Sequence, residues 1–279
     1  MSWEGKTLSD ELVIEQKQGL GNTGTQIGVQ TNIDNHPTIY VGPTLEDVTR
    51  IVTNLFLDNF TRMRQMAKEE SEMRANELWD KIMFELSKLK INDLSAFTQV
   101  DVQYSMYEAQ KNYARFATPE LLSNLSSLIA KRVNYNDDGM CLKVAIDQAI
   151  SIVGMLTQAQ LDYLALMFLV TKVKFENINT IEDLGKHLNY LDSVFSKAKD
   201  SNWQHLNMLG CLQLDLPDVC KIYAKRYNFK KSDVEKICPQ NIKVLSGDYS
   251  TSPIGTIIAI IRAEQKTPYQ LDPKIWIRD

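Results

Sequence analysis

Along most of the chain, apolar residues recur every three or four positions, which is the spacing of an amphipathic helix. The pattern is longest in residues 44–91, where it runs from Leu45 to Leu89 without a glycine or proline. Such length without internal breaks favours a long helix or coiled-coil element. The charged stretch 68–77 weakens the apolar face, so two helices separated at this stretch are the alternative.

Residues 92–200 are predicted to form a helical core. Thr118 followed by Pro119, and Thr180 followed by acidic residues, are typical helix starts. Residues 152–173 are apolar enough to suggest a membrane span, but polar residues including Asp162 interrupt them. We expect a buried helix with Asp162 partly on its outward side.

Residues 1–43 have a different character, because they contain half of the chain's 12 glycines. Within them, residues 25–33 alternate between β-branched and polar side chains, and this period of two predicts a strand. We therefore expect a β-rich N-terminal arm.

Residues 201–279 are predicted to form the last region. Strand-like residues 241–249 are broken by Gly247, and Ser252 then caps a helix. A short hairpin followed by a helix resembles a winged-helix end, and residues 267–279 are expected to be an extended tail. The predicted fold class is thus mainly α, a multi-helix bundle with a β-rich arm, a long helix and this C-terminal region.

Composition narrows the functions. The net charge of −4 and pI of about 5.5 argue against a nucleic-acid partner, since such binders show a basic excess. The first residues have neither a basic nor an apolar segment of a secretory signal. With four scattered cysteines and no CxxC pair, a reduced, cytoplasmic protein without membrane contact is predicted.

Gly19, Gly21 and Gly24 spell GxGxxG, the fingerprint of a dinucleotide site. That site needs a helix directly after the glycines, whereas residues 25–33 have the period of a strand. We therefore interpret the glycines as a turn in the arm and predict no cofactor.

No catalytic or metal-binding residues are predicted. Residues 134–139 (NYNDDG) resemble half of a calcium loop, but Ala145 stands where the bidentate Glu belongs, so a turn that ends a helix is expected. An enzyme with a dispersed site, built on His205 with Cys211 or Cys220, stays an alternative.

Self-association is the predicted activity. An uncharged strand with Gln and Asn on one face can pair with copies of itself, either as an ordinary inter-subunit strand or in an amyloid-like stack. The long helix would reinforce this contact. The predicted oligomerisation residues are Gln26, Ile27, Gly28, Val29, Gln30, Ile33, Leu45, Val48, Val52 and Leu55.

Three segments carry a family resemblance: residues 156–166 (LTQAQLDYLAL), 209–216 (LGCLQLDL) and 249–261 (YSTSPIGTIIAII). Together they resemble uncharacterised bacterial helical proteins related to the Abi-alpha abortive-infection family. The last segment departs from the family's Leu-Thr-x-x-Gly pattern, with Ser250 or Thr251 where Leu-Thr is expected.

The resemblance implies a role in anti-phage defence, with a phage or host protein as the trigger, and it brings no catalytic residues. The expected function is a non-enzymatic, self-associating defence protein. A nucleic-acid-binding module in the winged-helix-like region is a further alternative.

Overall fold

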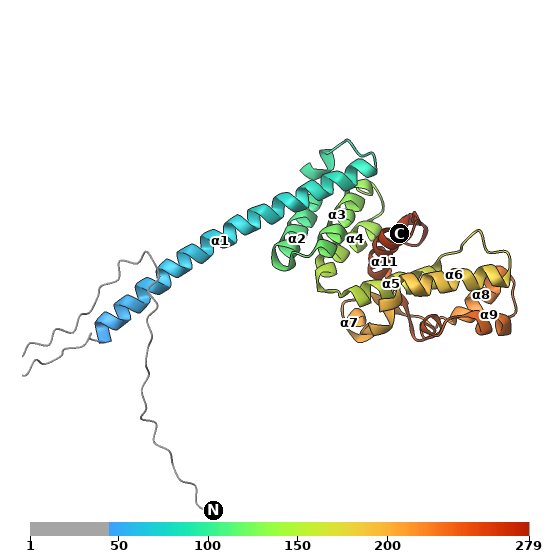
Figure 1. The fold of residues 1–279 in the computed structure, drawn as a ribbon. Helices are drawn as coiled ribbons and strands as arrows, with labels where there is room; N and C mark the ends of the chain where they lie inside the picture. Colours follow the sequence, from blue (N-terminus) through green and yellow to red (C-terminus); the bar gives the residue numbers. More distant parts are fainter. Residues whose placement is uncertain (1–44, 279) are drawn as a thin grey trace, which may run out of the picture. The chain divides into compact units, whose positions relative to one another are not determined.

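The computed structural model describes residues 45–278 (Figure 1). The chain divides into two units, Met1–Leu55 and Phe56–Asp279, and the helical core belongs to the second. The predicted β-rich arm lies outside the described residues, and so do six of the predicted oligomerisation residues: Gln26, Ile27, Gly28, Val29, Gln30 and Ile33.

The mainly α class is confirmed for the described residues. The helices are α1 (Leu45–Lys88), α2 (Val100–Phe116), α3 (Pro119–Asn134), α4 (Met140–Ile152), α5 (Gln158–Lys172), α6 (Ile181–Val194), α7 (Trp203–Met208), α8 (Val219–Tyr227), α9 (Lys231–Ile237), α10 (Gln240–Lys243) and α11 (Pro253–Lys266). Short 3-10 turns are η1 (Ser95–Thr98), η2 (Val153–Met155), η3 (Ser196–Asp200) and η4 (Pro273–Ile275). Two strands, β1 (Leu212–Leu214) and β2 (Tyr249–Thr251), pair antiparallel.

The predicted helix starts are confirmed where the sequence supplied a cap. The Thr118 hydroxyl accepts the Leu121 N–H, with Pro119 as the first helical residue. Thr180 forms a capping box with Asp183 at the start of α6. The Ser252 hydroxyl accepts the Gly255 N–H at the start of α11. These side chains satisfy N–H groups that the first helical turn leaves without a partner.

The core is centred on α5 and α11, which make the most extensive helix pair of the fold. All residues of α5 from Gln160 to Val170 are buried except Tyr163, so this helix has no solvent face. In Figure 1, α2, α3 and α4 lie side by side, and α3 and α4 also contact α11. A helix that is apolar on most sides needs neighbours on most sides.

Asp162 was predicted to point partly outward, and this prediction is wrong. Its side chain is fully buried and forms ion pairs with Arg262 Nε and Lys266 Nζ, both at 2.7 Å. Both cations come from α11, and Lys266 also donates to the Val194 carbonyl at 2.9 Å. The pairing neutralises a carboxylate that burial would otherwise strongly disfavour.

A second buried charge joins α2, α3 and α4. The Arg132 side chain, 1% exposed, pairs through Nε with Asp147 Oδ1 at 2.9 Å and through a terminal nitrogen with Asp101 Oδ2 at 2.5 Å. Ser105 donates to the same Asp147 oxygen at 2.6 Å. The Arg132 guanidinium of α3 thus binds carboxylates from α2 and α4, because its several N–H donors can serve more than one acceptor.

The winged-helix-like hairpin predicted for residues 241–249 is not formed. Gln240–Lys243 is the short helix α10, and β2 pairs with β1, which precedes it by three helices. Residues 201–214 contain α7 followed by β1. Short apolar runs fit either structure, and the deciding partner is distant in the sequence.

Gly255 permits a close approach between α11 and the start of β1. A Cβ at this position would lie 2.0 Å from the Cys211 carbonyl oxygen. The same oxygen accepts the Ser252 N–H at 3.0 Å, and Ser252 Oγ donates to the Gly210 carbonyl at 2.6 Å. Only glycine allows the backbones to meet this closely.

The tail after α11 is packed against the core, and not extended as predicted. Leu271, Pro273 and Ile277 are buried. The Trp276 ring packs edge-on against the Phe168 ring of α5, with ring centroids 4.9 Å apart. The Trp276 N–H donates to the Lys172 carbonyl at 3.4 Å. The tail therefore covers the C-terminal end of α5.

Candidate functional site

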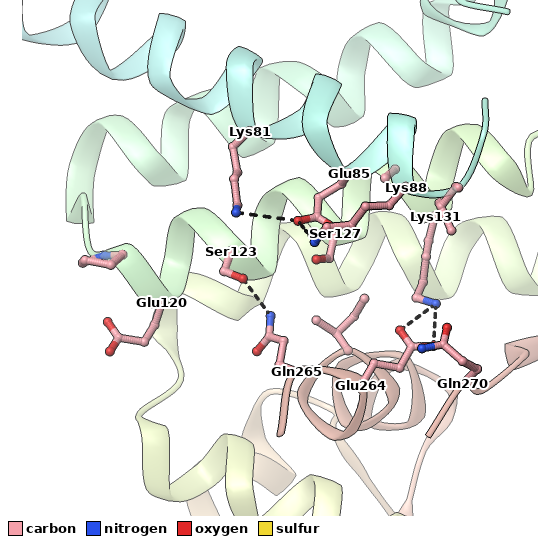
Figure 2. Close-up of a pocket in the computed structure, with 14 residues that line it drawn as sticks. Lys81, Glu85, Lys88, Glu120, Ser123, Ser127, Lys131, Glu264, Gln265 and Gln270 are labelled. Atoms are coloured by element: carbon pink, nitrogen blue, oxygen red, sulfur yellow. Dashed lines mark hydrogen bonds and ion pairs between the residues drawn. The ribbon is translucent and has the colours of Figure 1, made fainter. Parts of the chain in front are cut away.

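A groove lies between the C-terminal part of α1, α3 and α11, and has a volume of about 760 Å³ (Figure 2). Most of its lining residues have polar or charged side chains. The residues are Lys81, Glu85, Lys88, Leu89, Pro119, Glu120, Ser123, Ser127, Ala130, Lys131, Ile261, Glu264, Gln265 and Gln270.

The charges of the groove are internally compensated. On α1, Glu85 lies between Lys81 and Lys88, at 3.7 and 3.0 Å respectively. Across the groove, Lys131 Nζ of α3 pairs with Glu264 Oε2 of α11 at 3.0 Å (Figure 2). Three lysines thus face three glutamates, so the groove carries no net charge that would attract an ion.

The groove offers hydrogen bonds but little chemistry. Gln265 Nε2 donates to Ser123 Oγ at 3.2 Å, and Figure 2 shows this link crossing from α11 to α3. No histidine or cysteine is among the lining residues, so neither serine has the neighbouring imidazole that usually activates a hydroxyl nucleophile. The arrangement suits cohesion between α3 and α11.

The dispersed active site considered for His205 is not assembled. His205 Nδ1 lies 2.8 Å from Gln160 Nε2, which also donates to the Asn202 carbonyl. Because Gln160 Oε1 accepts from the Thr157 N–H, its amide is oriented to donate, and the imidazole nitrogen therefore accepts. His205 acts as a helix-to-helix contact between α7 and α5.

The cysteines are suited to packing. Cys141, Cys211, Cys220 and Cys238 form no disulfide within residues 45–278, and the last three are buried. Burial raises the pKa of the Cys211 and Cys238 thiols to about 12 and also raises that of Cys220. Because the thiolate is the nucleophile, these groups are inert at neutral pH.

His187 is a half-buried titratable group that sequence reasoning did not single out. Its ring packs against Phe175, with centroids 4.1 Å apart, and its Nε2 is buried without a hydrogen-bond partner. Burial lowers the pKa of His187 to about 4. The imidazole is therefore neutral at physiological pH and acts as part of the core.

The remaining predicted oligomerisation residues, Leu45, Val48, Val52 and Leu55, lie on the N-terminal part of α1. Helix α1 is continuous through the charged stretch, which answers whether residues 44–91 form one helix or two. Farther along, residues 64–73 are exposed at every position, and burial of α1 starts at Leu78, followed by Ile82 and Leu86.

Metal clusters and membrane spans are both lacking in the described part of the chain. Within residues 45–278, no three His, Cys, Asp or Glu side chains are grouped so that they could hold a metal ion. None of the helices in this range has the length and apolar content required to span a bilayer. Residues 134–139, whose sequence resembles half of a calcium loop, form the turn between α3 and α4.

A family model described as ":-like" matches residues 42–250. The chain belongs to this family. The matched range extends from just before α1 into β2, so it includes α2 to α10 and ends before α11. Neither a curated protein nor a solved structure matches the chain. The family description contains no activity, and the Abi-alpha resemblance stays a prediction.

Sequence reasoning missed the groove and the buried charge clusters. Each of them joins residues from helices that are far apart in the chain, such as Lys131 with Glu264 and Asp162 with Arg262. The available signal was a charged residue inside an otherwise apolar helix. Such a residue is seldom buried unless it is paired, and the sequence does not name the partner.

Proposed function

We propose that this chain is a non-enzymatic protein that associates with copies of itself through α1 and the N-terminal arm, and that it acts in bacterial anti-phage defence. The observation that supports self-association is the exposed length of α1 that precedes its packed end. Residues 64–73 are exposed throughout, and burial starts only at Leu78. The defence role rests on the Abi-alpha resemblance alone.

The sequence of the preceding part of α1 supports the same proposal. Residues 45–63 contain apolar residues at helical spacing, including Leu45, Val48, Val52 and Leu55. Their spacing of three and four residues is that of the a and d positions of a coiled coil. A helix with such a stripe gains stability by burying it, and a second α1 is a partner of matching length and pattern.

The charged stretch of α1 is consistent with a solvated continuation of this helix. Glu70 pairs with Arg74, and Lys68 lies 3.8 Å from Glu72, both across one turn. Pairs at this spacing stabilise an exposed helix by about 0.3–0.5 kcal/mol each. They allow α1 to stay helical between its apolar segment and its packed end.

The alternatives receive less support. The nucleic-acid alternative depended on a hairpin that residues 241–249 do not form. The enzyme alternative depended on His205 with a nearby thiol, whereas His205 contacts Gln160 and the Cys211 thiol is held neutral by burial. Neither is proposed.

Light scattering coupled to size exclusion tests the proposal. We expect an oligomeric mass for the full chain, and a lower mass both for Val52→Glu and for a chain lacking residues 1–43. Asn54→Glu is the matched control, because Asn54 is an exposed position on the same helix, away from the apolar stripe. A monomeric mass for all four proteins overturns the proposed self-association.

The defence role has its own test. We expect bacteria that express the full chain to plate phage less efficiently, and Val52→Glu to remove this protection while Asn54→Glu retains it. Equal phage plating on cells with and without the protein, across a broad phage panel, contradicts the defence role and leaves the self-association test unaffected.

A further inference from the structure

The small sheet has an edge whose backbone groups point away from β2, and of the two residues concerned Leu212 is only 6% exposed. In the β1–β2 register, Leu212 faces Thr251, Gln213 faces Ser250 and Leu214 faces Tyr249. Just beyond the strands, Ser252 N–H donates to the Cys211 carbonyl and Asp215 N–H donates to the Asp248 carbonyl, both at 3.0 Å. Hydrogen-bonded pairs alternate along an antiparallel ladder.

It follows that Cys211, Gln213 and Asp215 direct their backbone groups toward β2. Leu212 and Leu214 direct theirs to the opposite side. No hydrogen bond found within residues 45–278 uses the backbone N–H or C=O of Leu212 or Leu214. An unpaired row of donors and acceptors is a template for another strand.

Apolar side chains flank this edge. Leu214 is 80% exposed and Leu216 is 77% exposed. Tyr249, opposite Leu214 in the register, lies on the same face of the sheet, and its ring packs on Trp203 with centroids 5.4 Å apart. Exposed apolar residues beside free backbone groups are the features that strand addition uses, the backbone for affinity and the side chains for specificity.

We infer that β1 pairs antiparallel with β1 of a second copy, in a two-fold register centred on Leu214, to give a four-stranded sheet β2-β1-β1-β2. In this register Leu214 faces Leu214 and Leu212 faces Leu216. The Leu216 N–H already donates to Asp215 Oδ1 at 2.9 Å, so Leu216 would offer only its carbonyl. The pairing forms about four new hydrogen bonds: each Leu214 N–H donates to the Leu214 carbonyl of the other copy, and each Leu212 N–H donates to the Leu216 carbonyl of the other copy.

The side chains favour this register over its neighbours. Centred on Leu214, Gln213 of one copy lies opposite Asp215 of the other, so an amide meets a carboxylate and two carboxylates do not meet. A register centred on Leu212 would require Gly210 to be extended, but Gly210 has φ of 72°. A register centred on Leu216 would need the Leu216 N–H, which already donates to Asp215 Oδ1 at 2.9 Å.

The contact is small, because each strand has three residues. Stable interfaces bury about 800 Å² on each partner, so β1 pairing alone is expected to be weak. Copies already joined through α1 would meet at a much higher effective concentration. The β1 contact is distinct from the α1 contact and gives the protein a second self-complementary surface.

Disulfide trapping of the full chain tests the register. Facing residues in a hydrogen-bonded pair have Cα atoms about 5.5 Å apart, within the range of about 4.4–6.8 Å that a disulfide spans. Under mild oxidation we expect Leu214→Cys to form a covalent dimer at least tenfold faster than Val100→Cys. Val100 is the matched control, since it is 81% exposed on α2. Equal rates for the two variants overturn the proposal.

Two further measurements make the test independent of α1. Leu214→Pro removes an N–H that β2 does not use, so we expect an unchanged melting temperature but loss of amide-exchange protection at Leu212, while the Asp215 amide keeps its bond to the Asp248 carbonyl. Val52→Glu is expected to lower the rate of Leu214→Cys trapping without abolishing it at high concentration. If deletion of residues 1–43 removes the protection while Leu214→Pro retains it, the arm covers this edge and the inference is wrong.

Discussion

Replacement of Asp162 by alanine is expected to destabilise the protein by about 3–5 kcal/mol, the usual cost of breaking a buried ion pair from one side. The carboxylate is fully buried and lies 2.7 Å from both Arg262 Nε and Lys266 Nζ. At an effective dielectric constant of about 20, the Coulomb attraction of each ion pair is about 6 kcal/mol before the cost of removing the charges from water is subtracted. Without Asp162, the Arg262 guanidinium stays buried and lacks its carboxylate.

The loss is large against a total stability of about 5–15 kcal/mol, so part of the Asp162→Ala protein is expected to be unfolded at 37 °C. Urea unfolding followed by circular dichroism measures it. Glu72→Ala is the matched control, because Glu72 forms an exposed pair with Lys68 and its loss is expected to cost less than about 0.5 kcal/mol. A loss below about 1 kcal/mol for Asp162→Ala refutes the reasoning that α5 and α11 are joined by this charge cluster.

Two other predictions concern single residues. Burial lowers the pKa of His187 to about 4 from 6.5, so the unfolded chain binds the proton first and stability falls as pH drops through this window. For the full pKa shift, the free energy of unfolding would fall by about 2 kcal/mol between pH 7 and pH 5. Because the side chain is partly exposed, we expect a fall of about 1 kcal/mol. His187→Phe should therefore show a smaller loss of the urea midpoint over this range, and an unchanged pH dependence contradicts the assignment. Gly255→Ala places a Cβ 2.0 Å from the Cys211 carbonyl oxygen, so we expect a loss of about 1–3 kcal/mol or more. Gly247→Ala is its control, because nothing lies within 4 Å of a Cβ there, and equal melting temperatures of the two variants would contradict the close approach.

Local signals in the sequence were sufficient to predict the helices that begin with a side-chain cap. Thr118, Thr180 and Ser252 each act on N–H groups within three residues, so a short window contains the whole interaction. The continuity of α1 could not be decided in this way, since a charged stretch fits both a solvated helix and a break.

Features that depend on distant partners were not predictable from local patterns. The segment that becomes β1 has too few residues to show a period, and its partner β2 lies beyond three further helices. Asp162 occupies a position where helical periodicity alone places a polar residue outward, but α11 supplies Arg262 100 residues later in the chain. The groove was not predicted for the same reason, because its lining residues come from α1, α3 and α11, which are far apart in the chain.

The pairing of α5 with α11 also has a consequence for synthesis on the ribosome. Helix α5 emerges as a segment with no water-compatible face, and the helix that covers it is made about 100 residues later, which takes about 5–20 s at typical rates of translation. During that interval the nascent chain exposes its most apolar helix. Expression should therefore depend on chaperone capacity. Because η4 and Trp276 cover the end of α5, their loss should be tolerated far less well than changes in the early residues.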